Sequence, residues 1–305
     1  MKEYIGKVAL DDTFYPGQDL YSDGPIEDEL LGIVSSCPEE EYSRVIGERK
    51  DWAILYHLSH VRWNIVEWLP ITKEQTVLEV GPGCGAITGV LSDKAKKVTC
   101  IELSKKRSTI NATRNRNRDN IEILLGNFQD VEESLTETYD WITLIGVFEY
   151  GQGYIDSENP YVDFLRRIKR HLKPGGRIVI AIENRLGLKY FAGCTEDHTG
   201  NYFEGIEGYP KPVHVRTFSR PELERLCREA ELTELEFYYP YPDYKLPMTI
   251  YSDEYLPKVG ELRDNRKNFD RERYLLFDES KAFDSIIKDG LFPVFSNSYL
   301  VICRS

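Results

Sequence analysis

Three glycines at alternate positions stand directly behind an apolar run that contains a carboxylate. The stretch reads TVLEVGPGCGAITGVL (76–91), so that Gly81, Gly83 and Gly85 follow Glu79. Glycine is needed where a backbone turns sharply and approaches a ligand so closely that a Cβ would prevent the contact. The spacing therefore predicts a loop that binds a nucleotide-like ligand.

The glycine turn alone does not identify that ligand. Together with Ala86 it also fits the G-x-G-x-x-A pattern of dinucleotide sites, and Glu102 could accept hydrogen bonds from the ribose of NAD or of an adenosyl ligand. Glu79 places a negative charge at the mouth of its strand. That charge favours a ligand carrying an ammonium and a sulfonium over one carrying a pyrophosphate. An NAD-dependent oxidoreductase remains an alternative.

Alternating strands and helices are expected to position this turn. Apolar residues at helical spacing predict a helix over 52–69, which Pro70 ends. Further helices are expected after Asn159-Pro160 and at Ser219, where Glu222 completes a capping box. Strands are predicted near 76–80, 97–103, 121–126, 140–147, 177–183, 235–244 and 296–304. Such β-α repeats imply an α/β, doubly wound, Rossmann-like sheet that binds ligands at the carboxyl ends of its strands.

Composition limits the class of protein. The chain has 305 residues, a net charge of −12, 41% apolar residues and six scattered cysteines without zinc-site spacing. It has no apolar stretch of membrane-spanning length and no signal-peptide pattern, so a cytoplasmic protein with no membrane span is expected. The acidic balance argues against a nucleic-acid partner. The basic runs at 105–107, 114–118 and 166–171 are interpreted as solvated helix faces.

Five segments, taken in order, resemble the class I S-adenosylmethionine-dependent methyltransferases. They are LEVGPGCG (78–85), IELS (101–104), GNFQD (126–130), YDWITLIGVFEY (139–150) and LKPGGRIVIAIEN (172–184). The resemblance covers roughly residues 70–240 and implies S-adenosylmethionine as the cofactor. It also implies a seven-stranded, mostly parallel sheet with an antiparallel last strand. We accordingly expect a helical cap over 1–70, a Rossmann-like methyltransferase domain over 71–245 with 291–305, and an insertion or lid over 246–290.

The resemblance assigns cofactor contacts by position. The glycine turn would pass under the methionine part, Glu102 would hold the ribose, and Asn127, where many members have Asp, would flank the adenine. Arg62 is a further candidate, for the cofactor carboxylate. The cofactor-binding residues expected in all are Glu79, Gly81, Pro82, Gly83, Gly85, Glu102, Leu103, Asn127, Phe128, Gly146, Val147, Phe148 and Arg62.

The segments IENRLGLKYFAGCTEDHTG (182–200) and RTFSRPEL (216–223) are similar to a narrower group, bacterial methyltransferase domains found beside or fused to glycosyltransferases. That similarity implies a sugar or surface-glycan precursor as acceptor and a glycosyltransferase as partner. A small metabolite or a peptide is the alternative acceptor. A non-catalytic scaffold is the alternative of another class.

A hydroxyl acceptor has to lose its proton during methyl transfer, so a positioned base would help. The hypothesis is that His198 is this base, oriented by Asp197 or Glu196, with Glu149 and His214 as rival bases. Substrate contacts are expected from Tyr150, Asn184, His214 and Tyr241. No metal is expected, because the spacing of the carboxylates does not demonstrate that they converge.

Overall fold

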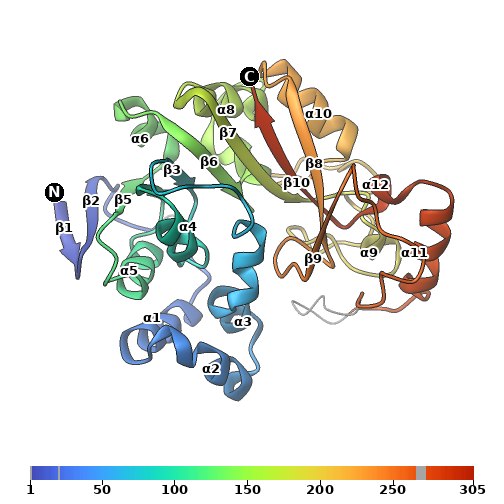
Figure 1. Cartoon of the computed structure of the whole chain (residues 1–305), viewed down its shortest axis with the longest axis horizontal. Helices are drawn as coiled ribbons and strands as arrows, with labels where there is room; N and C mark the ends of the chain where they lie inside the picture. Colours follow the sequence, from blue (N-terminus) through green and yellow to red (C-terminus); the bar gives the residue numbers. More distant parts are fainter. Residues whose placement is uncertain (1, 20, 266–272) are drawn as a thin grey trace. The chain divides into compact units, whose positions relative to one another are not determined.

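The computed structural model describes residues 2–19, 21–265 and 273–305, and the chain divides into two compact units (Figure 1). The first unit comprises Met1–Ile145 with Arg167–Arg177, and the second comprises Gly146–Arg166 with Ile178–Ser305. Helix α8 (Pro160–Lys169) and strand β7 (Leu172–Glu183) each run from one unit into the other.

The first unit is built on parallel strands. Its strands follow the order β1-β2-β5-β4-β3-β6, in which β3 is parallel to both β4 and β6, and β5 is parallel to both β4 and β2. The bounds are β1 Lys2–Ile5, β2 Val8–Phe14, β3 Thr76–Val80, β4 Lys97–Glu102, β5 Ile121–Gly126 and β6 Tyr139–Ile145. Helices α4 (Thr88–Lys94), α5 (Lys105–Arg114) and α6 (Phe128–Ser134) connect the predicted strands. The predicted α/β alternation is therefore present.

The N-terminal segment differs from the expected helical cap because it begins with a β-hairpin. Strands β1 and β2 are antiparallel, and β2 buries Val8, Ala9 and Leu10 while it extends the sheet beside β5. Helices follow, with α1 at Ile26–Ser36, η1 at Glu39–Glu41, α2 at Tyr42–Arg49, α3 at Trp52–Leu58 and η2 at His60–Ile65. Because α1 buries Leu30, Ile33 and Val34 at helical spacing, it packs against α5.

The single helix predicted over 52–69 is wrong. Helix α3 ends at Leu58 and a 3-10 helix begins at His60, with Ser59 extended between them. The Ser59 hydroxyl accepts a hydrogen bond from the Val61 backbone N–H at 3.2 Å, so this serine caps a new helix.

The second unit contains antiparallel strand pairs. Strand β10 (Ser298–Arg304) lies between β7 and β8 (Glu234–Tyr241) and is antiparallel to both, and β9 (Thr249–Ser252) pairs with β8. The predicted antiparallel last strand is therefore present. The described residues contain three strands beyond the predicted seven, namely β1, β2 and β9.

Short helices complete the second unit. They are η3 Phe148–Tyr150, α7 Gly151–Tyr154, α9 Leu188–Phe191, α10 Arg220–Glu229, α11 Glu279–Lys288 and α12 Phe292–Phe295. Helix α10 begins with the predicted capping box, in which the Ser219 backbone N–H donates to Glu222 Oε2 at 2.9 Å. The expected insertion at 246–290 contains β9 and α11, and its residues 266–272 lie outside the described residues. Across the described chain, every helix is too short or too polar to span a bilayer.

Candidate active site

The glycine turn of the first unit has the backbone that its sequence predicts. Gly81, Gly83 and Gly85 have φ angles of 64°, 54° and 76°, values that side-chain-bearing residues adopt only with strain. The Pro82 carbonyl accepts a hydrogen bond from the Gly85 N–H at 3.0 Å, which closes the turn. The turn thus presents bare backbone at the end of β3.

Glu102, the last residue of β4, anchors this turn. Its Oε2 accepts the Gly83 backbone N–H at 2.9 Å, and its Oε1 accepts the Ser104 N–H at 3.0 Å. Each carboxylate oxygen keeps a second lone pair for a ligand hydroxyl. Glu102 therefore both shapes the glycine turn and can hold a ribose.

Glu79 is a buried carboxyl at the end of β3 with one oxygen in need of a partner. The Thr88 hydroxyl donates to its Oε2 at 2.7 Å, whereas its Oε1 has no hydrogen bond within the part of the chain that the structure describes. Burial raises the pKa of Glu79 to about 7. An orphaned buried oxygen in this position fits a cationic group of a cofactor, and S-adenosylmethionine carries two.

The other expected cofactor residues are divided between the units. In the first unit, the Asn127 side chain accepts the Gln129 N–H at 3.4 Å and caps α6, with Phe128 buried behind it and Leu103 half-buried after Glu102. The Arg62 guanidinium, also in this unit, is buried over the Tyr56 ring at 4.2 Å. Gly146, Val147 and Phe148 belong to the second unit, where a Cβ on Gly146 would lie 2.8 Å from the Tyr244 hydroxyl.

Replacing Glu102 by alanine is expected to weaken S-adenosylmethionine binding at least about tenfold. The change removes the acceptor of the Gly83 N–H, and a hydrogen bond to a charged group contributes about 1.5 kcal/mol or more. Calorimetric titration of the purified variant tests this. The matched control is Glu122→Ala, which removes a carboxylate from neighbouring β5 that is paired with Lys2 and Lys97. Equal affinities of the two variants would contradict the assignment.

The affinity for S-adenosylmethionine is expected to rise about tenfold between pH 6 and pH 8 through Glu79. Below pH 7 this carboxyl is mostly protonated and neutral, and above pH 7 it is ionised and attracts the cationic cofactor. The measurement is the dissociation constant across this range for the wild type and for Glu79→Gln. Ionisation of the cofactor itself affects the wild type and the variant equally. The same pH dependence of the dissociation constant in both proteins would therefore count against Glu79.

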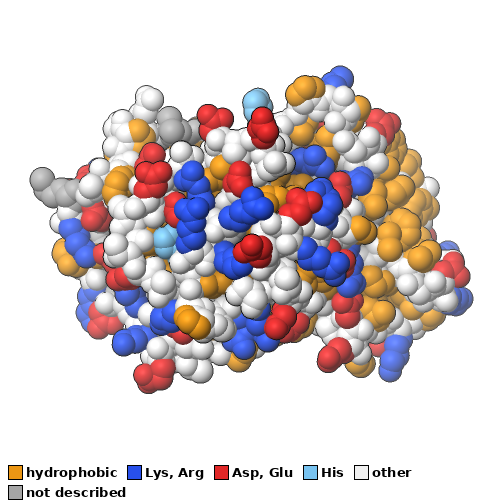
Figure 2. Space-filling model, turned by 90° about the horizontal axis from the view of Figure 1, so that it is seen from above, with side chains coloured by type: hydrophobic (Ala, Val, Ile, Leu, Met, Phe, Trp, Pro, Cys, Tyr) orange, Lys and Arg blue, Asp and Glu red, His pale blue; other side chains and the backbone are white. Residues whose placement is uncertain are grey.

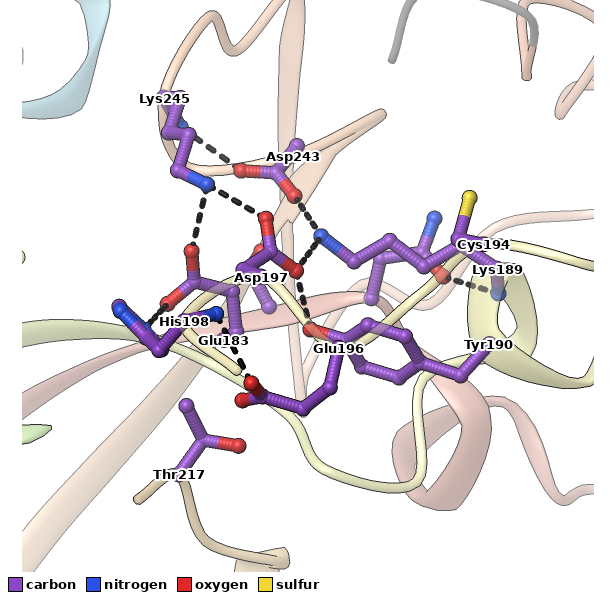
Figure 3. A network of polar contacts seen from close by, with 12 residues as sticks. Glu183, Lys189, Tyr190, Cys194, Glu196, Asp197, His198, Thr217, Asp243 and Lys245 are labelled. Atoms are coloured by element: carbon purple, nitrogen blue, oxygen red, sulfur yellow. Dashed lines mark hydrogen bonds and ion pairs between the residues drawn. The ribbon is translucent and has the colours of Figure 1, made fainter. Parts of the chain in front are cut away.

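In the second unit, the imidazole of His198 lies beside the carboxylate of Glu183 (Figure 3). Its Nε2 lies 3.7 Å from Glu183 Oε2, and its Nδ1 lies 3.4 Å from the Tyr150 hydroxyl. Ligand-capable atoms of Glu149, Glu183 and His198 all lie within 4.8 Å of one another. Of the sequence candidates, the structure thus brings together His198, Glu149 and Tyr150, and adds Glu183, the last residue of β7.

Charges within this group shift its proton affinities. Burial and the charge of Glu183 raise the pKa of Glu149. Burial opposes the ionisation of Glu183, but the Lys245 ammonium, 2.7 Å from Glu183 Oε1, and the His198 imidazole together outweigh it and lower the pKa of Glu183. Burial likewise opposes the charge of His198, but Glu183 and Glu149 raise its pKa to about 9. Glu149 and His198 therefore favour their protonated forms at neutral pH, whereas Glu183 is ionised.

The predicted orientation of His198 by Asp197 is not what the structure contains. The Asp197 carboxylate pairs instead with Lys189 at 2.9 Å and with Lys245 at 2.6 Å, and it accepts the Tyr190 hydroxyl (Figure 3). Glu196 accepts the backbone N–H of His198 at 2.8 Å rather than its ring. The carboxylate beside the imidazole is Glu183.

Three expected substrate residues have other surroundings. The Asn184 side chain donates to the carbonyls of Val294 and Ser296 at 2.8 and 2.7 Å, so it is a structural residue at the end of β7. The Tyr241 hydroxyl accepts the Asp264 N–H at 2.7 Å. His214 is exposed.

Comparison with known proteins bears on the cofactor region. Residues 78–180 match the family model described as a methyltransferase domain. Ribosomal RNA small subunit methyltransferase A of Borreliella burgdorferi is 30% identical over 96 residues, or 31% of this chain and 34% of that protein. Its probable counterpart in Pyrococcus abyssi is 43% identical over 68 residues, or 22% of this chain and 24% of that protein. The chain spans about a third or less of the length of these curated relatives.

Solved structures share only distant sequence similarity with this chain. A methyltransferase of Archaeoglobus fulgidus that depends on S-adenosylmethionine has a TM-score of 0.49 at 13% identity, covering 87% of this chain and 99% of that chain. A possible histamine N-methyltransferase of Thermotoga maritima has a TM-score of 0.46 at 16% identity, covering 87% and 97%. The family match coincides with the glycine turn, Glu79 and Glu102. Residues 78–180 are therefore a methyltransferase domain whose cofactor is S-adenosylmethionine.

Proposed function

We propose that the protein transfers a methyl group from S-adenosylmethionine to a hydroxyl of a sugar or surface-glycan precursor. The observation that carries this proposal is the group formed by Glu149, Glu183 and His198 in the second unit. When bound, the cofactor supplies a methyl group whose bond to sulfur breaks, leaving the electron pair on sulfur, as the bond to the acceptor oxygen forms. The chain has to align the acceptor oxygen and accommodate its proton.

An aliphatic hydroxyl explains why such a group is needed. An amine acceptor can attack with a free electron pair, whereas a sugar hydroxyl is a weak acid that has to be activated. Buried glutamates beside an imidazole provide this activation, because they take up a proton or increase the acidity of a hydroxyl placed against them. The Tyr150 hydroxyl lies 3.4 Å from His198 Nδ1, and Glu183 Oε2 lies 3.7 Å from His198 Nε2, so each ring nitrogen has a polar neighbour.

An RNA acceptor, as in the names of the curated relatives, fits the surface less well. Each basic run of the chain is paired with acidic side chains, as in Arg107 with Asp23 at 2.9 Å and Arg118 with Asp93 at 2.8 Å. On the face shown in Figure 2, lysines and arginines are interspersed with aspartates and glutamates. With a net charge of −12, the chain as a whole repels a polyanion.

The test is methyl transfer from S-adenosylmethionine labelled in its methyl group. The purified protein is incubated separately with nucleotide sugars, bacterial surface oligosaccharides, peptides, small amines and ribosomal RNA. We expect label in a carbohydrate as an ether methyl group, resistant to mild base. Label in the peptide, amine or RNA fraction alone would reject the proposal. The proposal also predicts that a glycosyltransferase acts on the same glycan.

A further inference from the structure

Three segments of the second unit converge on one point. Glu149 comes from η3, Glu183 from the end of β7, and His198 from the loop after α9. One carboxylate oxygen of each glutamate and one imidazole nitrogen lie within 4.8 Å of one another. Atoms at such separations can share one ion at metal–ligand distances of about 2.0–2.4 Å after small rotations.

Each of the three residues has a buried polar side-chain atom without a hydrogen bond. Glu149 Oε2, Glu183 Oε2 and His198 Nε2 are all buried, and none has a hydrogen-bond partner in residues 2–19, 21–265 or 273–305. The Glu149 residue is only 1% exposed, and Glu183 is fully buried. Unpartnered buried polar atoms are costly, and several that converge indicate a ligand.

The charge balance points to a cation as that ligand. Five carboxylates belong to this network: Glu149, Glu183, Glu196, Asp197 and Asp243. Two ammonium groups, Lys189 and Lys245, are their basic partners. The carboxylates therefore outnumber the ammonium groups by three, and by two when the His198 imidazole is protonated. Buried charge of one sign has to be compensated by protons or by a bound cation.

We propose that Glu149, Glu183 and His198 bind a divalent cation that accepts both carboxylate and imidazole ligands. Mn²⁺ is such a cation and is the probe used in the test below. Carboxylates suit Mn²⁺ and Mg²⁺, while the imidazole favours the more nitrogen-binding Mn²⁺ or Zn²⁺. Three protein ligands leave coordination positions open for an acceptor oxygen. This inference rests on the proposed function and specifies how the same group activates the hydroxyl.

Neighbouring residues orient the three ligands as an outer shell would. Lys245 occupies Glu183 Oε1 at 2.7 Å and leaves Oε2 for the cation. Tyr150, 3.4 Å from His198 Nδ1, can accept the proton of that nitrogen and leave Nε2 with its lone pair. A cation at this point would coordinate the acceptor hydroxyl and lower its pKa. The O–H bond then breaks, water takes the proton, and the oxygen keeps the electron pair that forms its bond to the methyl carbon.

The experiment is a titration of the purified protein with Mn²⁺ alone, in which binding is measured as the loss of the electron paramagnetic resonance signal of the free ion. We expect about one Mn²⁺ per chain, displaced by excess Zn²⁺, and at least about tenfold weaker binding in Glu149→Gln and in His198→Ala. The matched control is Glu132→Gln, because Glu132 is also a buried glutamate beside a histidine, His171, at 2.9 Å. Circular dichroism identifies any variant that fails to fold. If one site variant does not fold, the other still decides.

Two results would overturn the cation site. One is a free-ion signal that wild-type protein leaves unchanged up to about 1 mM Mn²⁺. The other is Mn²⁺ binding by the site variants that is as tight as in Glu132→Gln. Methyl transfer measured after treatment with a chelator separates this inference from the proposed function. If carbohydrate methylation persists without metal, the role of the cation is rejected and the proposed carbohydrate acceptor stands. If Mn²⁺ binds at these residues but methylation is confined to peptide, amine or RNA, the carbohydrate acceptor is rejected and the cation site stands.

Discussion

Replacing His198 by alanine is expected to lower the kcat of methyl transfer about a hundredfold or more, while the Kd for S-adenosylmethionine stays within about twofold. The variant removes the only imidazole that faces Glu149 and Glu183 within the described structure. Whether that imidazole moves a proton or ligates a cation, the acceptor hydroxyl loses its activation. The measurement is single-turnover methyl transfer at saturating cofactor and acceptor.

The comparison variant is His171→Ala, because His171 is a buried histidine whose ring lies 2.9 Å from a buried glutamate, Glu132, in the first unit. It reproduces the loss of a buried His–Glu contact without touching the group around His198. Its kcat per folded molecule should equal that of the wild type. A His198 variant with wild-type kcat would show that the group has no part in the reaction.

The glycine turn and its strand were predictable because their signal is local. Eleven successive residues from Thr76 to Ala86 contain the buried strand, its carboxylate and the turn glycines. The apolar residues indicate the strand, and the glycines indicate a turn with positive φ angles. The hairpin β1–β2 was not predicted. Its pairing with β5, with Ala9 opposite Glu122, joins residues more than a hundred positions apart, which no local pattern encodes.

The group around His198 was predicted only in part, for the same reason. His198, Glu149 and Tyr150 were candidates by type and by their place at strand ends, but Lys189 and Lys245 were missed. Their partner Asp197 is far from Lys245 in sequence, and the pairing depends on how the loops after β7 and β8 fold. A usable signal existed for Glu183, which ends an apolar strand with a carboxylate just as Glu102 does.

Replacing Gly85 by alanine is expected to lower the free energy of unfolding by about 2–5 kcal/mol. Part of this is strain, because a φ of 76° costs a residue with a Cβ about 1–2 kcal/mol. The rest is a collision, since the new Cβ would lie 2.2 Å from Asn111 Oδ1, and overpacking of this kind costs about 1–3 kcal/mol. Asn111 cannot easily withdraw, because it is buried and its side chain donates to Thr88 at 3.1 Å.

Gly175→Ala separates these two contributions. Gly175 belongs to the same unit and has almost the same φ, 75°, but a Cβ there would have no heavy atom within 4 Å. Urea unfolding should therefore give a loss of about 1–2 kcal/mol for Gly175→Ala and a clearly larger one for Gly85→Ala. Adding Asn111→Ala to Gly85→Ala should recover part of the difference, because it removes the atom that collides. Equal losses in the two single variants would mean that the turn shifts away from Asn111 at little cost, and the requirement for glycine would then come from φ alone.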